Sequence, residues 1–143
     1  MKVVADTMIW VSYCVRPDGF RHQLVEEARR KRVRFFVSAY ILDELQRTLT
    51  EDLGRGRRFA GLARRAVARV AKLVELPSFV PKHVPGDPNN DPIVQTALTS
   101  KADYLVTEDT EVLKLGKIRS TEVITASEFA FRLEADPKDR DEK

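Results

Sequence analysis

The sequence of 143 residues has a single cysteine, Cys14, and only two histidines, His22 and His83. A lone cysteine cannot form an internal disulfide, which excludes a secreted scaffold held by disulfides and favours a reducing cytoplasm. One cysteine and two histidines also cannot supply the four ligands of a closed structural zinc site. These absences predict a cytoplasmic protein whose fold depends on an ordinary hydrophobic core, for which 43% hydrophobic residues are sufficient.

Long apolar segments are also missing from the sequence. No run approaches the roughly 18 residues that span a bilayer, and the first 20 residues lack the pattern of a signal peptide. We therefore expect no membrane association. The length predicts one domain over residues 1–135, and the charged residues 136–143 are expected to form a disordered tail.

The net charge of +3 is small, but the charges are unevenly distributed. Residues 16–72 contain 15 basic and 7 acidic residues, a net charge of +8, whereas the remainder has a net charge of −5. A basic middle segment is typical of a protein with a polyanionic partner. Such a segment is also typical of helices that present charged residues to solvent, so charge alone leaves both interpretations open.

Short apolar segments alternate with segments of helical periodicity along the whole chain. Strands are expected at residues 2–5, 33–37, 79–80, 104–106 and 123–124, and helices at about 20–31, 38–49, 59–74, 91–100 and 127–133. This alternation predicts an α/β fold, a three-layer α/β/α sandwich around a mostly parallel sheet of four to five strands. Sites in such folds form beyond the carboxyl ends of the strands.

Acidic residues occur at those positions. Asp6 follows the first strand, Asp109 follows the strand at 104–106, and Asp91 begins the helix before it, with Pro92 at a favoured helix start. Each acid alone also has an ordinary structural role, as a strand end, an N-cap or a turn residue. Their shared location is harder to explain by such roles.

The helix after the second strand contributes a fourth acid. Its apolar stripe begins at Ile41, and at about 100° per residue Glu44 lies at about 300° while Asp43 lies at about 200°. Glu44 therefore flanks the buried stripe, whereas Asp43 is expected to point to solvent. Between these two acids, Glu44 is the candidate site residue.

Four carboxylates at one end of a sheet repel one another unless cations lie between them. A divalent metal ion removes this conflict. With no cluster of histidine or cysteine available, the ligands would all be oxygen atoms, which suits Mg²⁺ or Mn²⁺ rather than zinc or copper. Such an ion can promote hydrolysis of a phosphodiester, and the basic segment can hold a nucleic acid backbone.

Four segments together resemble a PIN domain. They are the Val-Val-Ala-Asp-Thr run ending at Thr7, the run from Val37 to Leu45, the Asp-Pro-Asn-Asn-Asp run at 87–91, and the Ala-Asp-Tyr-Leu-Val-Thr-Glu-Asp run ending at Asp109. The resemblance is strongest to the ribonuclease toxins of toxin–antitoxin systems. It implies a metal-dependent endoribonuclease that forms a homodimer and is inhibited by a cognate antitoxin. It also implies that Asp6, Glu44, Asp91 and Asp109 are the catalytic acids and metal ligands.

One position departs from this family. Two residues after the first acid the family usually has asparagine, whose amide can bond neighbouring acids, and here that residue is Met8. The supporting hydrogen bonds must then come from other side chains, for which Thr7, Ser12, Ser38 and Thr107 are candidates, with Asp87 assisting from its loop. The departure leaves open a second interpretation, a catalytically weak or inactive module that binds RNA or protein.

Arg55, Arg57 and Arg58 lie in a glycine-containing turn and are the predicted contacts to RNA phosphates. A denser basic run occupies residues 29–34. The same charges also suit an acidic segment of an antitoxin, so the pattern does not decide between the two partners.

Overall fold

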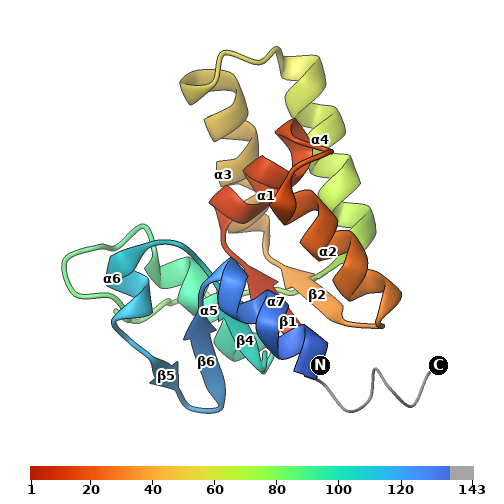
Figure 1. Ribbon diagram of the computed structural model, residues 1–143. Coiled ribbons are helices and arrows are strands. Elements are labelled where there is room, and N and C mark those ends of the chain that lie inside the picture. The colour runs from red at the N-terminus through yellow and green to blue at the C-terminus, as the bar shows by residue number, and fades with distance from the viewer. Residues whose placement is uncertain (136–143) are drawn as a thin grey trace.

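The computed structural model describes residues 1–135, in which strands and helices alternate (Figure 1). The strands are β1 Lys2–Ala5, β2 Arg34–Val37, β3 Ala71–Leu73, β4 Tyr104–Val106, β5 Lys117–Ile118 and β6 Thr121–Ile124. The helices are α1 Thr7–Val15, α2 Phe20–Arg30, α3 Ala39–Arg47, the π-helix η1 Thr48–Asp52, α4 Arg57–Val70, α5 Asp91–Thr99, α6 Thr110–Leu113 and α7 Ala126–Ala135. The predicted disordered tail, residues 136–143, lies outside the described residues.

The strands form one sheet in the order β3-β2-β1-β4-β6-β5. All neighbours are parallel except β5 and β6. In the centre, Val4 of β1 pairs with Phe36 on one side and Leu105 on the other. The α/β class and the mostly parallel sheet are confirmed. The sheet has six strands rather than four or five, because β5 is too short to give a sequence pattern.

The expected strand at residues 79–80 is wrong. Phe79 is 77% exposed in an irregular segment, and the strand beside β2 is instead β3, within the expected helix at 59–74. Helix α4 ends at Val70, and the next residues pair with β2 up to Leu73 beside Val37. This pairing satisfies backbone groups of β2 that another helical turn would leave without partners.

Helix α1 was not predicted, because its sequence has no amphipathic stripe. Ile9, Trp10, Val11 and Tyr13 are all buried, so apolar residues occupy successive positions around the helix. Asp6 caps its first turn by accepting a hydrogen bond from the N–H of Ile9. The helix therefore begins directly where β1 ends.

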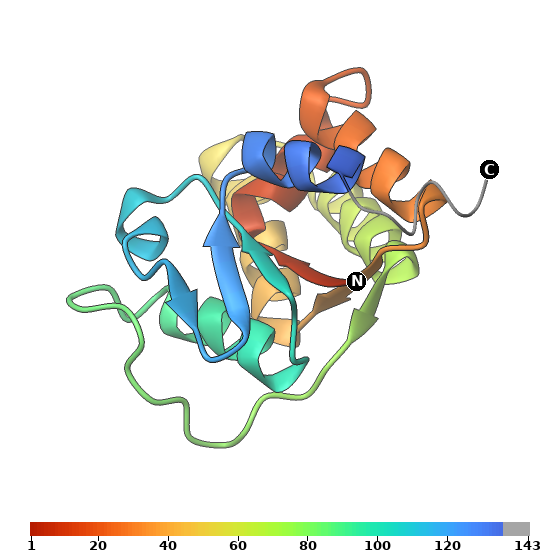
Figure 2. The same cartoon turned by 60° about the horizontal axis from the view of Figure 1, so that its bottom comes forward.

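Helices cover both faces of the sheet, as the predicted three layers require (Figure 2). Helix α5 packs against β1, β2 and β4 on one face, and α7 lies across the opposite face beside α2. Helices α3 and α4 pack together and project beyond the sheet, with the turn that joins them farthest from it (Figure 1). Within residues 1–135, no helix has both the length and the apolar character of a membrane span.

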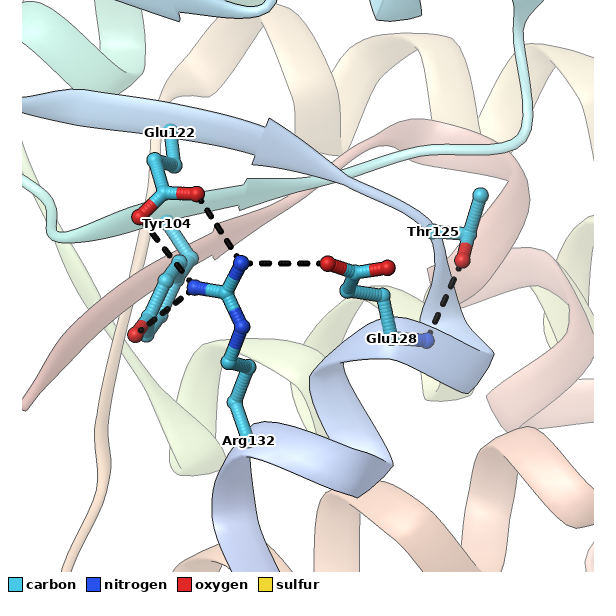
Figure 3. Close-up of polar contacts among 5 residues, drawn as sticks. All are labelled: Tyr104, Glu122, Thr125, Glu128 and Arg132. Carbon is cyan, nitrogen blue, oxygen red and sulfur yellow. Dashed lines mark hydrogen bonds and ion pairs between the residues drawn. The ribbon is translucent and has the colours of Figure 1, made fainter. Parts of the chain in front are cut away.

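Helix α7 is fixed to the sheet by Arg132 (Figure 3). Its guanidinium donates to both carboxylate oxygens of Glu122 on β6 at 3.1 Å and to Glu128 one turn earlier at 3.0 Å. It also lies 5.6 Å from the ring centroid of Tyr104 on β4. Hydrogen bonding to Arg132 lowers the pKa of Glu122, so the pair stays ionised over a wide pH range.

Candidate active site

The carboxyl ends of β1 and β4 are neighbours in the sheet, and the chain leaves β1 toward β2 on one side before returning to β4 on the other. This is the switch point at which ligands bind in open α/β folds. Asp6 follows β1, and Thr107 with Asp109 follow β4. The two acids therefore come from segments far apart in sequence and lie at one edge of the sheet.

A cavity of about 500 Å³ opens at this edge. The residues around it are Asp6, Thr7, Met8, Glu44, Thr48, Asp87, Asn89, Asn90, Ile93, Glu108 and Asp109. Five of them are acids, and within the described chain no lysine or arginine borders the cavity. The charged residues of the wall are therefore all acidic, although Glu108 pairs at 3.7 Å with Arg21, which is not one of the wall residues.

Asp6 is the most enclosed of these acids, with 7% of the residue exposed. Its Oδ1 accepts from the N–H of Ile9 at 3.1 Å, and its Oδ2 accepts from the hydroxyl of Thr107. Burial raises the pKa of Asp6, and the charge of Asp109 raises it further, although these hydrogen bonds act in the opposite direction. The ionised form of Asp6 is therefore costly unless a cation lies nearby.

Asp109 is held in a similar way at the start of α6. Its Oδ1 accepts from the N–H of Glu111 at 2.9 Å, and its own N–H donates to Oγ1 of Thr107 at 3.0 Å. The hydroxyl of Thr107 therefore links the two acids, because it donates to Asp6 and accepts from Asp109. The second carboxylate oxygen of Asp109 accepts from the side-chain amide of Asn90 at 3.1 Å.

Helix α3 places its two neighbouring acids as their helical phase predicts. Glu44 borders the cavity, where its Oε1 accepts from the hydroxyl of Thr7. Asp43 is exposed and accepts from Arg64 of α4 at 2.7 Å. The structure therefore brings Glu44, and not Asp43, to the cavity with Asp6 and Asp109.

The structure does not bring Asp91 to the cavity wall. Its Oδ1 accepts from the N–H groups of His83 and Val84, both at 2.8 Å, so this carboxylate holds the preceding loop. The N-cap of α5 is Asn90, and Asp91 is the first helical residue. Asn90 and Asp87 border the cavity instead, joined by a 2.6 Å hydrogen bond from the amide of Asn90 to Asp87.

Of the side-chain hydroxyls expected to support the acids, some lie at the cavity and others do not. Thr7 and Thr107 both donate to acids of the cavity. Ser38 accepts from Thr96 of α5 at 2.8 Å, away from the cavity, and Ser12 is likewise not among the residues that border it. Met8 borders the cavity and is 56% exposed. An amide that donates to an acid of the cavity comes from Asn90 instead.

The oxygen atoms of carboxylates, hydroxyls and amides around the cavity fit a hard divalent cation, and Met8 adds one sulfur atom to the wall. Among residues 1–135, no three His, Cys, Asp or Glu side chains lie close enough to enclose one ion. A hard divalent ion that keeps several of its waters needs only one or two carboxylates from the protein, whereas a cage built from protein ligands alone needs more.

Comparison with known proteins identifies the family of the chain. A sequence model of the PIN domain matches residues 2–111, from β1 to the start of α6. The chain belongs to the PIN domain family. PIN domains are nuclease domains, which generally use divalent metal ions.

A solved structure has the same fold as this PIN domain. It is the crystal structure of VapBC2 from Rickettsia felis bound to a DNA fragment from its promoter, with a TM-score of 0.64 and 13% sequence identity. The match covers 87% of this chain and 98% of the other. No curated protein sequence matches the chain. The similarity in structure is therefore far stronger than the similarity in sequence.

The predicted RNA-binding arginines of this PIN domain lie away from the acids. All three are exposed at the end of the projecting helices, where Arg55 lies in the turn after η1 and Arg57 and Arg58 begin α4 (Figure 1). Arg55 lies 5.1 Å from the ring centroid of Phe59. None of the three borders the acidic cavity.

Sequence reasoning missed Asn90 and Glu108 as residues of the cavity. Asn90 was part of an ordinary Pro- and Asn-rich loop, and asparagine before a helix is typical of an N-cap. Glu108 follows Thr107 in a segment whose predicted acid was Asp109. No periodicity in these segments indicates which way the side chains point. The sequence therefore contains no signal that distinguishes Asn90 from Asp91, or Glu108 from Asp109, as a residue of the cavity.

Proposed function

We propose that this PIN domain is a metal-dependent endoribonuclease that hydrolyses RNA phosphodiester bonds. The observation that carries the proposal is the meeting of Asp6, Glu44, Asp87 and Asp109 around one cavity without cationic side chains in its wall. These acids come from β1, α3, the loop before α5 and the end of β4. An ordinary structural role does not explain why acids from four separate segments meet at one place.

In this proposal one or two of these carboxylates would bind Mg²⁺ or Mn²⁺ directly, and the others would act through water molecules that the ion keeps. Thr107 keeps Asp6 and Asp109 in fixed orientations, and Thr7 does the same for Glu44. When bound, such an ion orients the phosphodiester and lowers the pKa of a water molecule. The exposed arginines of the projecting helices hold the RNA backbone, since the negative cavity itself repels phosphates.

We further propose that the chain acts in the cytoplasm as the toxin of a toxin–antitoxin pair. The VapBC2 structure from Rickettsia felis, which shares this fold, supports a protein partner. In this proposal a cognate antitoxin inhibits the nuclease, and the nuclease forms a homodimer. Growth arrest after induced expression, relieved by Asp6→Asn, is the expected cellular result.

The test is cleavage of a mixed pool of single-stranded RNA by the purified chain, with Mg²⁺ or Mn²⁺ and with EDTA. Asp6→Asn and Glu44→Gln are expected to reduce metal-dependent cleavage by about 100-fold or more. Asp43→Asn is the matched control, because Asp43 is adjacent to Glu44 in α3 but is exposed and bonded to Arg64. Equal cleavage by all four proteins would reject this active site.

A second candidate function is an RNA- or protein-binding module without catalysis. The observation that favours it is the wide spacing of the acids, since no three ligating side chains of residues 1–135 lie together around one point. RNA binding without cleavage, together with no binding of Mn²⁺ at near-millimolar concentration, would support this module. Metal-dependent cleavage that Asp6→Asn removes would exclude it.

A further inference from the structure

The side chain of Asn90 does not perform the usual task of an N-cap residue. An N-cap asparagine normally accepts a hydrogen bond from a free N–H in the first turn of its helix, and at α5 no such bond is formed. Its Nδ2 instead donates to Oδ2 of Asp87 at 2.6 Å and to Oδ2 of Asp109 at 3.1 Å. The amide thus lies between two acids of the cavity that are 22 positions apart in the sequence.

We propose that Asn90 is a positioning residue of the acidic cavity, whose amide holds the carboxylates of Asp87 and Asp109 together in the arrangement that receives the cation. The proposal rests on the function proposed above and names a residue that the family resemblance did not assign. In Asp91, the acid that the resemblance assigned, one carboxylate oxygen accepts from the N–H groups of His83 and Val84.

The loop before α5 explains why an amide is needed. Asp91 fixes that loop through its bonds to residues 83 and 84, and the fixed loop brings Asp87 toward Asp109. The two carboxylates repel each other when both are ionised. Because an amide has two N–H groups, Asn90 donates to each carboxylate and offsets this repulsion without adding charge.

An acid in place of Asn90 would act in the opposite way. Aspartate has nearly the same size as asparagine, so Asn90→Asp changes the charge and the hydrogen bonding of the side chain but hardly its volume. It removes both donated hydrogen bonds and adds negative charge to a cavity already bordered by five acids. Without a metal ion, the variant should therefore be less stable than the native chain. A bound cation should stabilise the variant more than it stabilises the native chain.

Asn89 provides a matched control for each variant. It is adjacent in sequence and borders the same cavity, but it is exposed, and its one hydrogen bond is accepted from Tyr40 by the backbone carbonyl. Asn89→Ala therefore removes an amide, and Asn89→Asp adds a negative charge, one residue away from Asn90. They leave the bonds to Asp87 and Asp109 in place.

The experiment measures the affinity for Mn²⁺ by calorimetry and the melting temperature in EDTA and in Mn²⁺, using the full chain. Asn90→Ala is expected to weaken Mn²⁺ binding about tenfold, and Asn89→Ala to leave it unchanged. In EDTA, Asn90→Asp is expected to melt about 4 °C below Asn89→Asp, and Mn²⁺ should remove most of this difference. A purely structural cap would lose the same stability with and without Mn²⁺.

Equal Mn²⁺ affinity of Asn90→Ala and Asn89→Ala would overturn the proposal. If the native chain binds no Mn²⁺ and cleaves no RNA, the proposed function is rejected. The melting temperatures in EDTA then test separately whether Asn90 links the two acids. A lower melting temperature of Asn90→Asp than of Asn89→Asp then supports the amide as the link between the acids. Equal melting temperatures reject it.

Discussion

The two carboxylate oxygens of Asp6 accept hydrogen bonds from different groups, one from the backbone and one from a side chain of the site. Its Oδ1 caps α1 through Ile9, and its Oδ2 accepts from Thr107 beside Asp109. Despite these bonds, burial raises its pKa, because the surrounding protein disfavours the ionised form. A buried carboxylate whose charge destabilises the metal-free fold is typical of a functional site.

The raised pKa of Asp6 predicts how stability varies with pH. Below about pH 4 the carboxyl is protonated in both the folded and the unfolded state. As the pH rises, the unfolded state loses this proton first, so the free energy of unfolding falls until the pH passes the pKa of the folded state. Asp6→Asn avoids this loss and keeps an oxygen that can cap α1. In EDTA at pH 7 we expect the variant to melt about 3 °C above the native chain.

Thermal unfolding measured from pH 4 to pH 8 checks this expectation. The difference between Asp6→Asn and the native chain should shrink toward pH 4. Asp43→Asn, at an exposed acid that pairs with Arg64, is the matched control and should not melt above the native chain at pH 7. A lower melting temperature of Asp6→Asn at pH 7 would contradict the destabilising role of the buried charge.

At the scale of elements, α7 illustrates how a terminal helix is attached to the sheet. Phe129 and Leu133 bury its apolar face, and Arg132 joins it to β6 through Glu122 and to β4 through Tyr104 (Figure 3). The guanidinium can bind both oxygens of one carboxylate because its N–H groups are arranged in a fixed planar fork. Glutamine at this position would keep neither the fork nor the charge.

Arg132→Gln is therefore expected to lower the free energy of unfolding by about 1 kcal/mol, a value limited by solvent screening of a partly exposed pair. The loss should decrease at high salt concentration. Chemical denaturation measures the change, and Lys114→Gln is the control. Lys114 pairs with Glu111 within the single turn of α6 and joins no separate elements, so its removal should not change stability measurably. Equal losses in the two variants would refute the attachment role of Arg132.

At the scale of the whole molecule, the acids of the cavity are separated in space from the arginines at the end of the projecting helices. The acids border the cavity at the carboxyl ends of the strands, while Arg55, Arg57 and Arg58 lie at the far end of the projecting helices (Figure 1). A polyanionic substrate is repelled by the first region and attracted by the second. The separation suits a substrate long enough to contact both regions at once.

Replacing Arg55, Arg57 and Arg58 together by glutamine is expected to weaken the binding of single-stranded RNA about tenfold or more, irrespective of its sequence. The slope of log affinity against log salt should fall by about 2, at about 0.7 for each lost phosphate contact. Fluorescence anisotropy in EDTA measures binding without cleavage. The affinity for Mn²⁺ should not change, because none of these residues borders the cavity.

A variant with Lys101, Lys114 and Lys117 replaced by glutamine controls for net charge, since it loses the same three charges from exposed positions elsewhere. It is expected to bind RNA nearly as well as the native chain. Equal weakening by both triple variants would indicate an effect of net charge alone. A loss confined to one RNA sequence would contradict a role in phosphate contact.

Local patterns in the sequence determined a large part of this protein. The buried run of β1, the helical phase that separates Glu44 from Asp43, and the acids after β1 and β4 are all properties of short segments. The scarcity of histidine and cysteine likewise predicted a site bordered mainly by side-chain oxygen atoms. Such features are readable because burial and helical rotation act on residues that are close in sequence.

Only the tertiary structure decided which side chain at the start of α5 enters the cavity. Asn90 and Asp91 are adjacent on a helical turn and differ in direction by about 100°, so the approach of the preceding loop selects between them. That approach brings the N–H groups of His83 and Val84 onto Asp91 and leaves Asn90 facing Asp87 and Asp109. The position of β3 was decided in the same way, by the free edge of β2. Contacts between distant segments set these outcomes, and no local pattern encodes them.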